Sequence, residues 1–364
     1  MNSRLKTIAG LAVGVIFVYW FAHKLDWTEV WTEVRLANWA LLSLAMISFT
    51  GTYFVRVIRW RALLEPMAQP SLSALFRATM VGFSALFLMG RAGELIVRPA
   101  MLSVRERVHP SASYATVMIE RVFDMVMVAF FFAVNFVFFE YTSSDAESVR
   151  VFGWIKALGA LLLCASIAGI YGLSVFRSRR AGALAYLERK LNWLPSKIKR
   201  GLLSLLTHIS EGLAVLHDAR GLTVMFSYTL ILWLMAALAH LLVVRAFSIP
   251  YAQIPLTGAV FLMGAAMLGS VVPTPGGATG PFHTAAAGAL IILGVEQNKA
   301  ASVAIILHLV MFIPATLFGM FYVFKDGLSL DRLRRIGEKQ VEEAEHPDGL
   351  TKEQGDESII TVQG

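Results

Sequence analysis

Long apolar runs, with no polar side, dominate the pattern of this chain. Six of these runs are about long enough for a helix to cross a ~30 Å hydrocarbon core. They cover roughly residues 5–22, 37–57, 113–139, 152–176, 222–247 and 300–324. The runs do not alternate between apolar and polar residues, as the strands of a membrane β-barrel do. Because a backbone in lipid must satisfy its hydrogen bonds within its own segment, the pattern predicts an all-α integral membrane protein.

Two further apolar stretches, at about residues 72–100 and 256–294, are interrupted by glycine and proline. The first is broken by Gly90, Gly93 and Pro99. The second is broken by Pro273, Pro275, Gly276, Gly277, Gly280 and Pro281. Proline kinks or ends a helix, and glycine allows conformations that other residues avoid. The sequence therefore has eight apolar segments, of which six read as plain spans.

The basic residues between the spans predict how the chain is oriented. Segment 177–200 carries eight Arg and Lys residues against Glu188 and is expected in the cytoplasm. Counting spans from there, and from the basic N-terminus, places both termini and segment 91–112 on the same side. The stretch 72–100 then starts and ends inside, and 256–294 starts and ends outside. Each is therefore expected to be a re-entrant hairpin.

This order predicts an inverted-topology repeat, a design common among transporters. The half-repeats cover about 5–139 and 152–324 within a membrane domain at 1–325. An amphipathic cytoplasmic linker at 177–220 joins the halves, and a largely disordered tail follows at 326–364. The alternative is eight plain spans without a repeat, which would leave the arginines of segment 91–112 outside.

Composition and charge agree with a membrane protein. The chain is 57% hydrophobic and 16% charged, whereas soluble domains average about 25% charged residues. The net charge of +7 lies largely in short segments between spans, so orientation in the membrane explains it better than nucleic acid. Cys164 is the only cysteine, and the chain has no phosphate-binding loop or metal-site motif. We therefore expect no metal, no cofactor and no nucleic-acid partner.

One charged cluster is expected at the break of the first hairpin. Arg91, Glu94 and Arg98 are spaced by three and four residues, which places them on one face of a helix. Arginine suits a phosphate because its planar fork can donate two hydrogen bonds at once. The cluster is a candidate site for a lipid phosphate, and the alternative is a salt-bridged cytoplasmic turn.

A second charged cluster lies inside the span 113–139. Glu120 and Asp124 are four residues apart, with Arg121 between them. Charges at membrane depth cost about 2.5–3.5 kcal/mol each on insertion scales, so they need a reason. They could pair with the hairpin arginines, bind a cationic head group or relay a proton. A purely structural lock between hairpin and span is the alternative.

The break of the second hairpin is a third candidate site. Pro275, Gly276, Gly277, Gly280 and His283 belong to it. Exposed backbone at membrane depth is tolerated around a cavity or ligand, and helix N-termini there would favour an anion. His283 would be the titratable group. A plain structural kink is the alternative.

The end of the second span carries Arg56, Arg59, Trp60 and Arg61. Most of this group is expected to be an anchor whose long side chains reach up to the inner interface. A contact between Arg59 and a lipid head group is the less favoured interpretation.

At these clusters the chain resembles the transmembrane, flippase-like region of the lysylphosphatidylglycerol synthase family, also called UPF0104. The matching stretches are residues 56–64, 90–98 and 120–124 and the Pro-Gly-Gly break, in that order. The family often has an acidic residue near the place of His283, and the spacing from Gly277 to Gly280 is one residue longer here.

The resemblance implies a bacterial inner-membrane protein that moves a lipid or lipid-linked head group between leaflets. Its partner would be a phospholipid or polyprenyl-linked lipid. We therefore expect a transporter rather than an enzyme, because no soluble synthase domain is present to transfer a lysyl group. The alternatives are a membrane enzyme acting on a lipid-linked phosphate, and a non-catalytic partner of a lipid synthase or glycosyltransferase.

Overall fold

The structure of the chain is a computed structural model. It covers residues 14–23, 25–65, 67–89, 91–106, 110–138, 219–272 and 274–326, with isolated positions between them. The expected span 152–176, the linker 177–220 and the tail 326–364 lie outside the described residues, apart from single positions. Within the described ranges every regular element is a helix.

Ten helices follow a helical segment at residues 14–22. They are α2 (Trp27–Leu36), α3 (Trp39–Leu64), α4 (Leu72–Met89), α5 (Arg91–Glu106), α6 (Pro110–Phe138), α10 (Ala219–Ala246), α11 (Leu256–Val271), α12 (Pro275–Ala278), α13 (Pro281–Ile292) and α14 (Gln297–Lys325). Among the described residues, α3, α10 and α14 are long and apolar enough to cross a bilayer. Helix α6 is also long, with 29 residues. It differs from these three helices because it carries three closely spaced charged residues, Glu120, Arg121 and Asp124.

Side-chain caps fix where several of these helices begin. The carboxylate of Asp26 accepts hydrogen bonds from the backbone N–H groups of Thr28 and Glu29 at the start of α2. Asn38 caps α3 in the same way, and Glu296 caps α14. These residues satisfy N–H groups that a helix start leaves without partners. The three capped starts lie near one end of the molecule.

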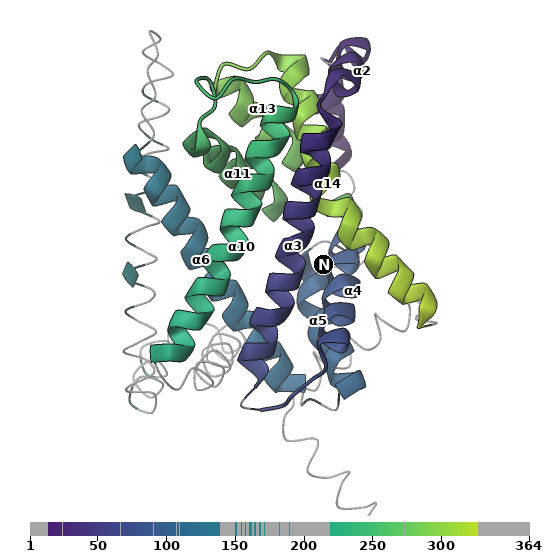
Figure 1. The fold of residues 1–364 in the computed structure, drawn as a ribbon, viewed down its shortest axis with the longest axis vertical. Helices are drawn as coiled ribbons and strands as arrows, with labels where there is room; N and C mark the ends of the chain where they lie inside the picture. The colour runs from purple at the N-terminus through teal and green to yellow at the C-terminus, as the bar shows by residue number, and fades with distance from the viewer. Residues whose placement is uncertain are drawn as a thin grey trace, which may run out of the picture.

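Helices α3 and α10 form the central packing pair (Figure 1). The backbone N–H of Asn38 donates to the carbonyl of Ala246 at 2.8 Å, and the Ser48 hydroxyl donates to the carbonyl of Met235 at 3.0 Å. The start of α3 therefore lies beside the end of α10, so the two helices are antiparallel. In Figure 1 the packed pair α4 and α5 lies at the lower end, and the packed pair α11 and α13 lies at the upper end.

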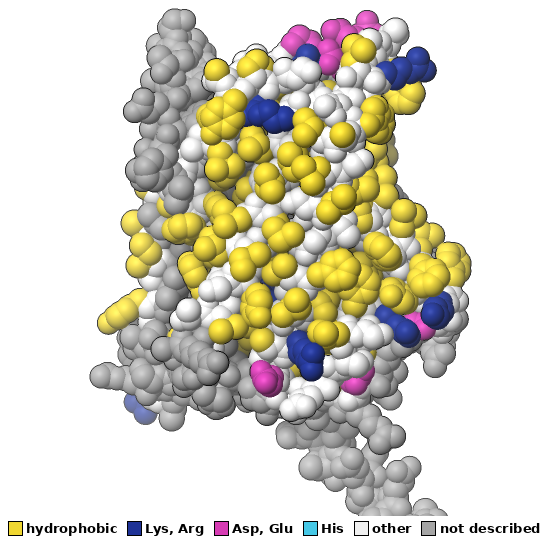
Figure 2. All heavy atoms as spheres, viewed as in Figure 1, with side chains coloured by type: hydrophobic (Ala, Val, Ile, Leu, Met, Phe, Trp, Pro, Cys, Tyr) yellow, Lys and Arg dark blue, Asp and Glu magenta, His cyan; other side chains and the backbone are white. Residues whose placement is uncertain are grey.

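The surface visible in Figure 2 is layered. Hydrophobic side chains cover the middle of this face, while acidic and basic side chains gather near its upper and lower ends. Such a band is what a hydrocarbon solvent requires of a protein surface.

The first interrupted stretch differs from the prediction in one respect. Helix α4 ends before Gly90, as expected, but α5 continues through Gly93 and Pro99. A proline inside a helix removes the hydrogen bond to the carbonyl four residues before it, and here the carbonyl of the proline itself binds side chains. The Pro99 carbonyl accepts hydrogen bonds from the hydroxyls of Ser103 at 2.9 Å and Ser113 at 3.3 Å. The prediction of breaks at Gly93 and Pro99 is therefore wrong, and the boundary between the two helices lies between Met89 and Arg91.

Candidate functional site

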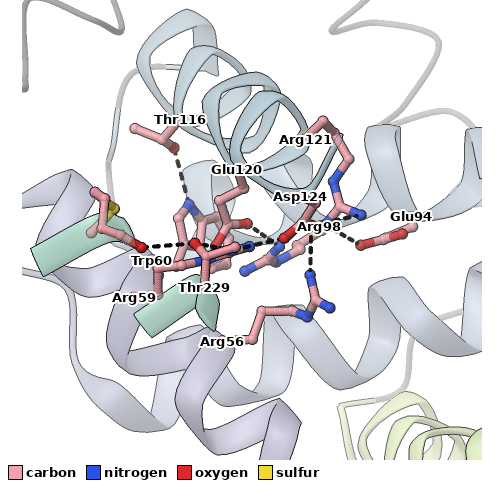
Figure 3. Close-up of polar contacts among 11 residues, drawn as sticks. Arg56, Arg59, Trp60, Glu94, Arg98, Thr116, Glu120, Arg121, Asp124 and Thr229 are labelled. Atoms are coloured by element: carbon pink, nitrogen blue, oxygen red, sulfur yellow. Dashed lines mark hydrogen bonds and ion pairs between the residues drawn. The ribbon is translucent and has the colours of Figure 1, made fainter. Parts of the chain in front are cut away.

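A cluster of charged side chains lies buried where α3, α5, α6 and α10 meet (Figure 3). Four arginines face three carboxylates there. The cluster consists of Arg56, Arg59, Glu94, Arg98, Glu120, Arg121 and Asp124. It brings together both charged clusters predicted from the sequence, and it adds two residues from the end of α3.

Arg59 is the centre of the cluster and is completely buried. Its Nη1 donates to Oδ1 of Asp124 at 2.8 Å and to the Thr229 hydroxyl at 2.9 Å, and its Nε donates to Oε1 of Glu120 at 3.3 Å. The interpretation of Arg56 and Arg59 as interfacial anchors is therefore wrong. The face of α3 that carries them packs on α6, whose carboxylates compensate for the lost hydration.

Arg98 approaches the cluster from α5 and is also completely buried. Its Nη1 donates to Oε2 of Glu120, so Glu120 accepts from two arginines on different helices. The Arg98 guanidinium carbon lies 4.0 Å from the centroid of the Trp60 ring, a cation–π geometry. Trp60 is held in turn, because its indole N–H donates to the Thr116 hydroxyl at 3.0 Å.

Arg121 and Arg56 complete the network at its more open side. Arg121 donates to Oε1 of Glu94 at 3.0 Å and lies 3.5 Å from Oδ2 of Asp124. Arg56 donates to the same oxygen of Asp124 at 3.2 Å. The Arg121 side chain is 22% exposed, so the network has an edge from which a ligand could reach it. Pairing between hairpin and span is thus present, as one of the predicted readings required.

Several N–H groups of these arginines have no hydrogen-bond partner. Within the described part of the chain, Nη2 of Arg59, both Nε and Nη2 of Arg98, and Nε of Arg121 are buried without a hydrogen-bond partner. Buried polar groups without partners are costly and rare, so these nitrogens mark a place where an anion or water would be stabilised. Four guanidinium groups against three carboxylates leave this set with an excess of positive charge.

The second predicted site lies at the break between α11 and α13. Gly276, Gly277 and Gly280 have φ angles of 76°, 68° and 96°, in the left-handed region that favours glycine. A Cβ on Gly277 would lie 2.7 Å from the Phe312 ring. The glycines are therefore required by this backbone path, whatever its function.

Two histidines line this break. The His308 Nε2 donates to the carbonyl of Gly277 at 3.3 Å, and the His308 ring centroid lies 4.7 Å from that of His283. His283 also stacks on Phe21, with centroids 5.4 Å apart. Among the described residues, no group of three or more His, Cys, Asp or Glu side chains is placed to hold a metal ion.

The predicted site residues thus fall into two groups on different helices. The side chains of Arg91 and Pro275 lie outside the described residues, so their place in these groups is untested. Sequence reasoning missed Thr229 and His308. His308 carried a usable signal, since it is an ionisable residue in an apolar span. Thr229 carried none, because a threonine in a membrane helix usually bonds to its own backbone.

Comparison with known proteins bears on the whole membrane region. The family model that describes the lysylphosphatidylglycerol synthase TM region matches residues 7–319. A search of curated proteins gave no match. The matched segment includes α3, α10, most of α14 and both groups of site residues. The chain is therefore a multi-pass membrane protein that belongs to the lysylphosphatidylglycerol synthase transmembrane-region family.

Proposed function

We propose that this protein moves a lipid or lipid-linked head group between the leaflets of the bacterial inner membrane. In this proposal the charged cluster described above binds the head group near the cytoplasmic side, and Arg91, predicted from the sequence, assists it. The break with Pro275, Gly276, Gly277, Gly280 and His283 receives it on the outer side. Both termini are cytoplasmic.

The observation that carries the proposal is the set of buried guanidinium N–H groups without partners. A structural ion-pair lock would be expected to use all of its donors on its own carboxylates. Arg59 and Arg98 both donate to Glu120, but Nη2 of Arg59 and both Nε and Nη2 of Arg98 have no hydrogen-bond partner among the described residues. Charge-assisted, forked hydrogen bonds of this kind match the oxygens of a phosphate. The head group is therefore proposed to be a phosphate ester.

Two further features support an inverted repeat of hairpins. Each helix pair is drawn together by a glycine on its first helix: a Cβ on Gly82 would lie 2.8 Å from Cβ of Arg98, and one on Gly269 would lie 2.5 Å from the carbonyl oxygen of Pro281. Helix α12, at the break of the second pair, contacts α4 of the first. Hairpins that enter from opposite sides and meet inside the bilayer would have these contacts.

The proposal is tested by lipid movement in proteoliposomes. Purified protein is reconstituted with fluorescently labelled phosphatidylglycerol, and the fraction bleached by a membrane-impermeant reductant is followed over time. Arg98→Lys keeps a cation for Glu120 but lacks both unused nitrogens. We expect it to slow lipid movement about ten- to hundredfold, because hydrogen bonds to charged groups contribute roughly 1.5–3 kcal/mol.

Arg61→Gln is the matched control for this experiment. Arg61 lies two residues after Arg59 on α3, and it is exposed, so its replacement should leave the rate unchanged. Absence of lipid movement by the wild-type protein would contradict the proposal. Dependence on a metal ion would favour an enzyme acting on a lipid-linked phosphate, and co-purification of a lipid synthase would favour a non-catalytic partner.

A further inference from the structure

The side chain of Tyr53 lies between the charged cluster and the break between α11 and α13. Tyr53 is buried on α3, three residues before Arg56, so the two residues share a face of the helix. Its ring packs edge-on against Phe83 of α4, with centroids 5.0 Å apart. The guanidinium carbon of Arg56 lies 5.3 Å from the centroid of the same Phe83 ring. Tyr53 is therefore one aromatic ring away from the charged cluster.

The hydroxyl of Tyr53 reaches the helix that lines the break. It donates a hydrogen bond to the carbonyl of Met311 on α14 at 2.8 Å. The next residue on α14 is Phe312, whose ring a Cβ on Gly277 would meet at 2.7 Å. The centroid of the Phe312 ring also lies 4.5 Å from that of His308, which donates to the Gly277 carbonyl. The contact between Tyr53 and α14 therefore joins the two sites.

Packed apolar side chains close this contact. Tyr53, Met80 and Ala315 form a buried cluster, and Phe49 and Phe83 pack against it. A phosphate that crossed from one site to the other would have to part these side chains, because a charge without partners is very costly in apolar surroundings. The two sites are thus neighbours that are closed to one another.

Helix α14 has a point of weakness beside the same contact. Pro314 lies inside α14, three residues after Met311, and a proline removes the hydrogen bond to the carbonyl four residues before it, here that of Val310. Sharp bends in helices usually lie at proline. The Ser84 hydroxyl on α4 donates to the carbonyls of the two residues that follow Pro314, at 3.1 and 3.3 Å. The hydroxyls of Tyr53 and Ser84 therefore hold α14 on either side of its weakest turn.

We propose that the hydroxyl of Tyr53 is a latch that keeps the passage between the two sites closed. The head group passes when the hydrogen bond to Met311 breaks and α14 bends at Pro314 away from α3. A hydrogen bond between neutral groups has a small net free energy, which suits a contact that opens and closes in each cycle. The inference rests on the proposed function, because a passage matters only in a protein that moves a head group.

Tyr53→Phe tests the latch, because it removes the hydroxyl and keeps the ring. In the proteoliposome assay we expect this variant to move labelled phosphatidylglycerol about three- to tenfold faster than the wild-type protein, as the loss of one neutral hydrogen bond from the closed state would produce. A merely structural contact would instead leave the rate unchanged or lower it. Tyr322→Phe is the matched control. Tyr322 packs its ring on Phe76 of α4, and its hydroxyl has no hydrogen-bond partner among the described residues, so the rate should stay the same.

Hydrogen exchange gives a second measurement that does not depend on lipid movement. Amide exchange of the full-length protein in detergent is followed by proteolysis and mass spectrometry. We expect the peptide that covers residues 311–318 to exchange about three- to tenfold faster in Tyr53→Phe than in the wild-type protein, because local opening sets the exchange rate. A peptide from residues 230–246 of α10 should not change.

The two measurements separate the latch from the proposed function. Absence of lipid movement by the wild-type protein would overturn the proposed function and, with it, the passage. Lipid movement by the wild-type protein without acceleration in Tyr53→Phe would overturn the latch alone. Unchanged exchange at residues 311–318 in the variant would also overturn the latch.

Discussion

Among the described residues, each buried arginine is paired with carboxylates from another helix. Arg59 and Arg98 have no exposed surface, and both donate to Glu120. Ionisable residues within the span 113–139 could be recognised from the sequence, because charge in an apolar run is expensive. The burial of Arg59 could not be recognised. Arginine at the end of a span is ordinarily an interfacial anchor, and only the packing of α3 on α6 removes it from water.

The ion pairs predict a specific pattern of non-additive mutations. Glu120→Gln removes the negative charge that Arg59 and Arg98 share and turns one of the two accepting oxygens into an NH2 donor, which should destabilise the protein by about 3–5 kcal/mol. Adding Arg98→Gln removes one of the stranded cations. The double variant should therefore lose less free energy of unfolding than the two single variants together, by about 0.5–3 kcal/mol. Thermal unfolding in detergent of both single variants and the double variant measures this, with Arg61→Gln as the neutral control. Additive effects would show that Arg98 and Glu120 are not coupled.

At the scale of elements, the closest contacts between helices lie at glycines, which have no side chain. The break at Gly90 and the break at residues 272–280 were predicted from glycine and proline. The continuation of α5 through Pro99 was not predicted, because a proline inside a helical pattern ordinarily ends or kinks the helix. The close approach of α14 to α4 was also not predictable. A glycine in an apolar span has no sequence feature that distinguishes tight packing from open space.

Substitution by alanine at two helical glycines of this protein should therefore have opposite effects on stability. A Cβ on Gly319 of α14 would overlap the hydroxyl of Ser84 and the carbonyl oxygen of Met80 on α4. Gly319→Ala should destabilise the protein by about 1–3 kcal/mol, the usual cost of overpacking. Gly288→Ala meets open space and should stabilise by about 0.5–1 kcal/mol, because alanine is the better helix former. Thermal unfolding of both variants in the same detergent measures these changes in stability. Equal changes in the two variants would contradict the packing described for α4 and α14.

For the whole molecule, the order of the spans and the sign of the charge on the segments between them predict one orientation in the membrane. The general class, a helical protein of the membrane, followed from apolar runs alone, because the bilayer leaves few alternatives. The prediction of two hairpins rests only on counting spans against charge. The contacts that bring α12 onto α4 could not be predicted from either, since they depend on how separate helices pack.

Cysteine labelling checks this orientation. In a Cys164→Ser background, Thr28→Cys at the start of α2 should react with a membrane-impermeant reagent in intact cells. Glu65→Cys at the end of α3 should react only after the cells are permeabilised, because the arginine-rich end of α3 is expected inside. Both positions are exposed, so accessibility alone does not separate them. Labelling of Glu65→Cys in intact cells would reverse the orientation on which the inner and outer sites depend.

The shared carboxylates of α6 also constrain how the protein is made. Arg56 and Arg59 leave the ribosome before Glu120 and Asp124, and each charge that enters lipid alone costs about 2.5–3.5 kcal/mol. Helix α3 therefore gains its full stability in the bilayer only after α6 has been synthesised and has come to lie against it. We therefore expect α3 to stay close to the insertion machinery until α6 arrives, so that the ion-pair cluster links the insertion of two helices far apart in the sequence.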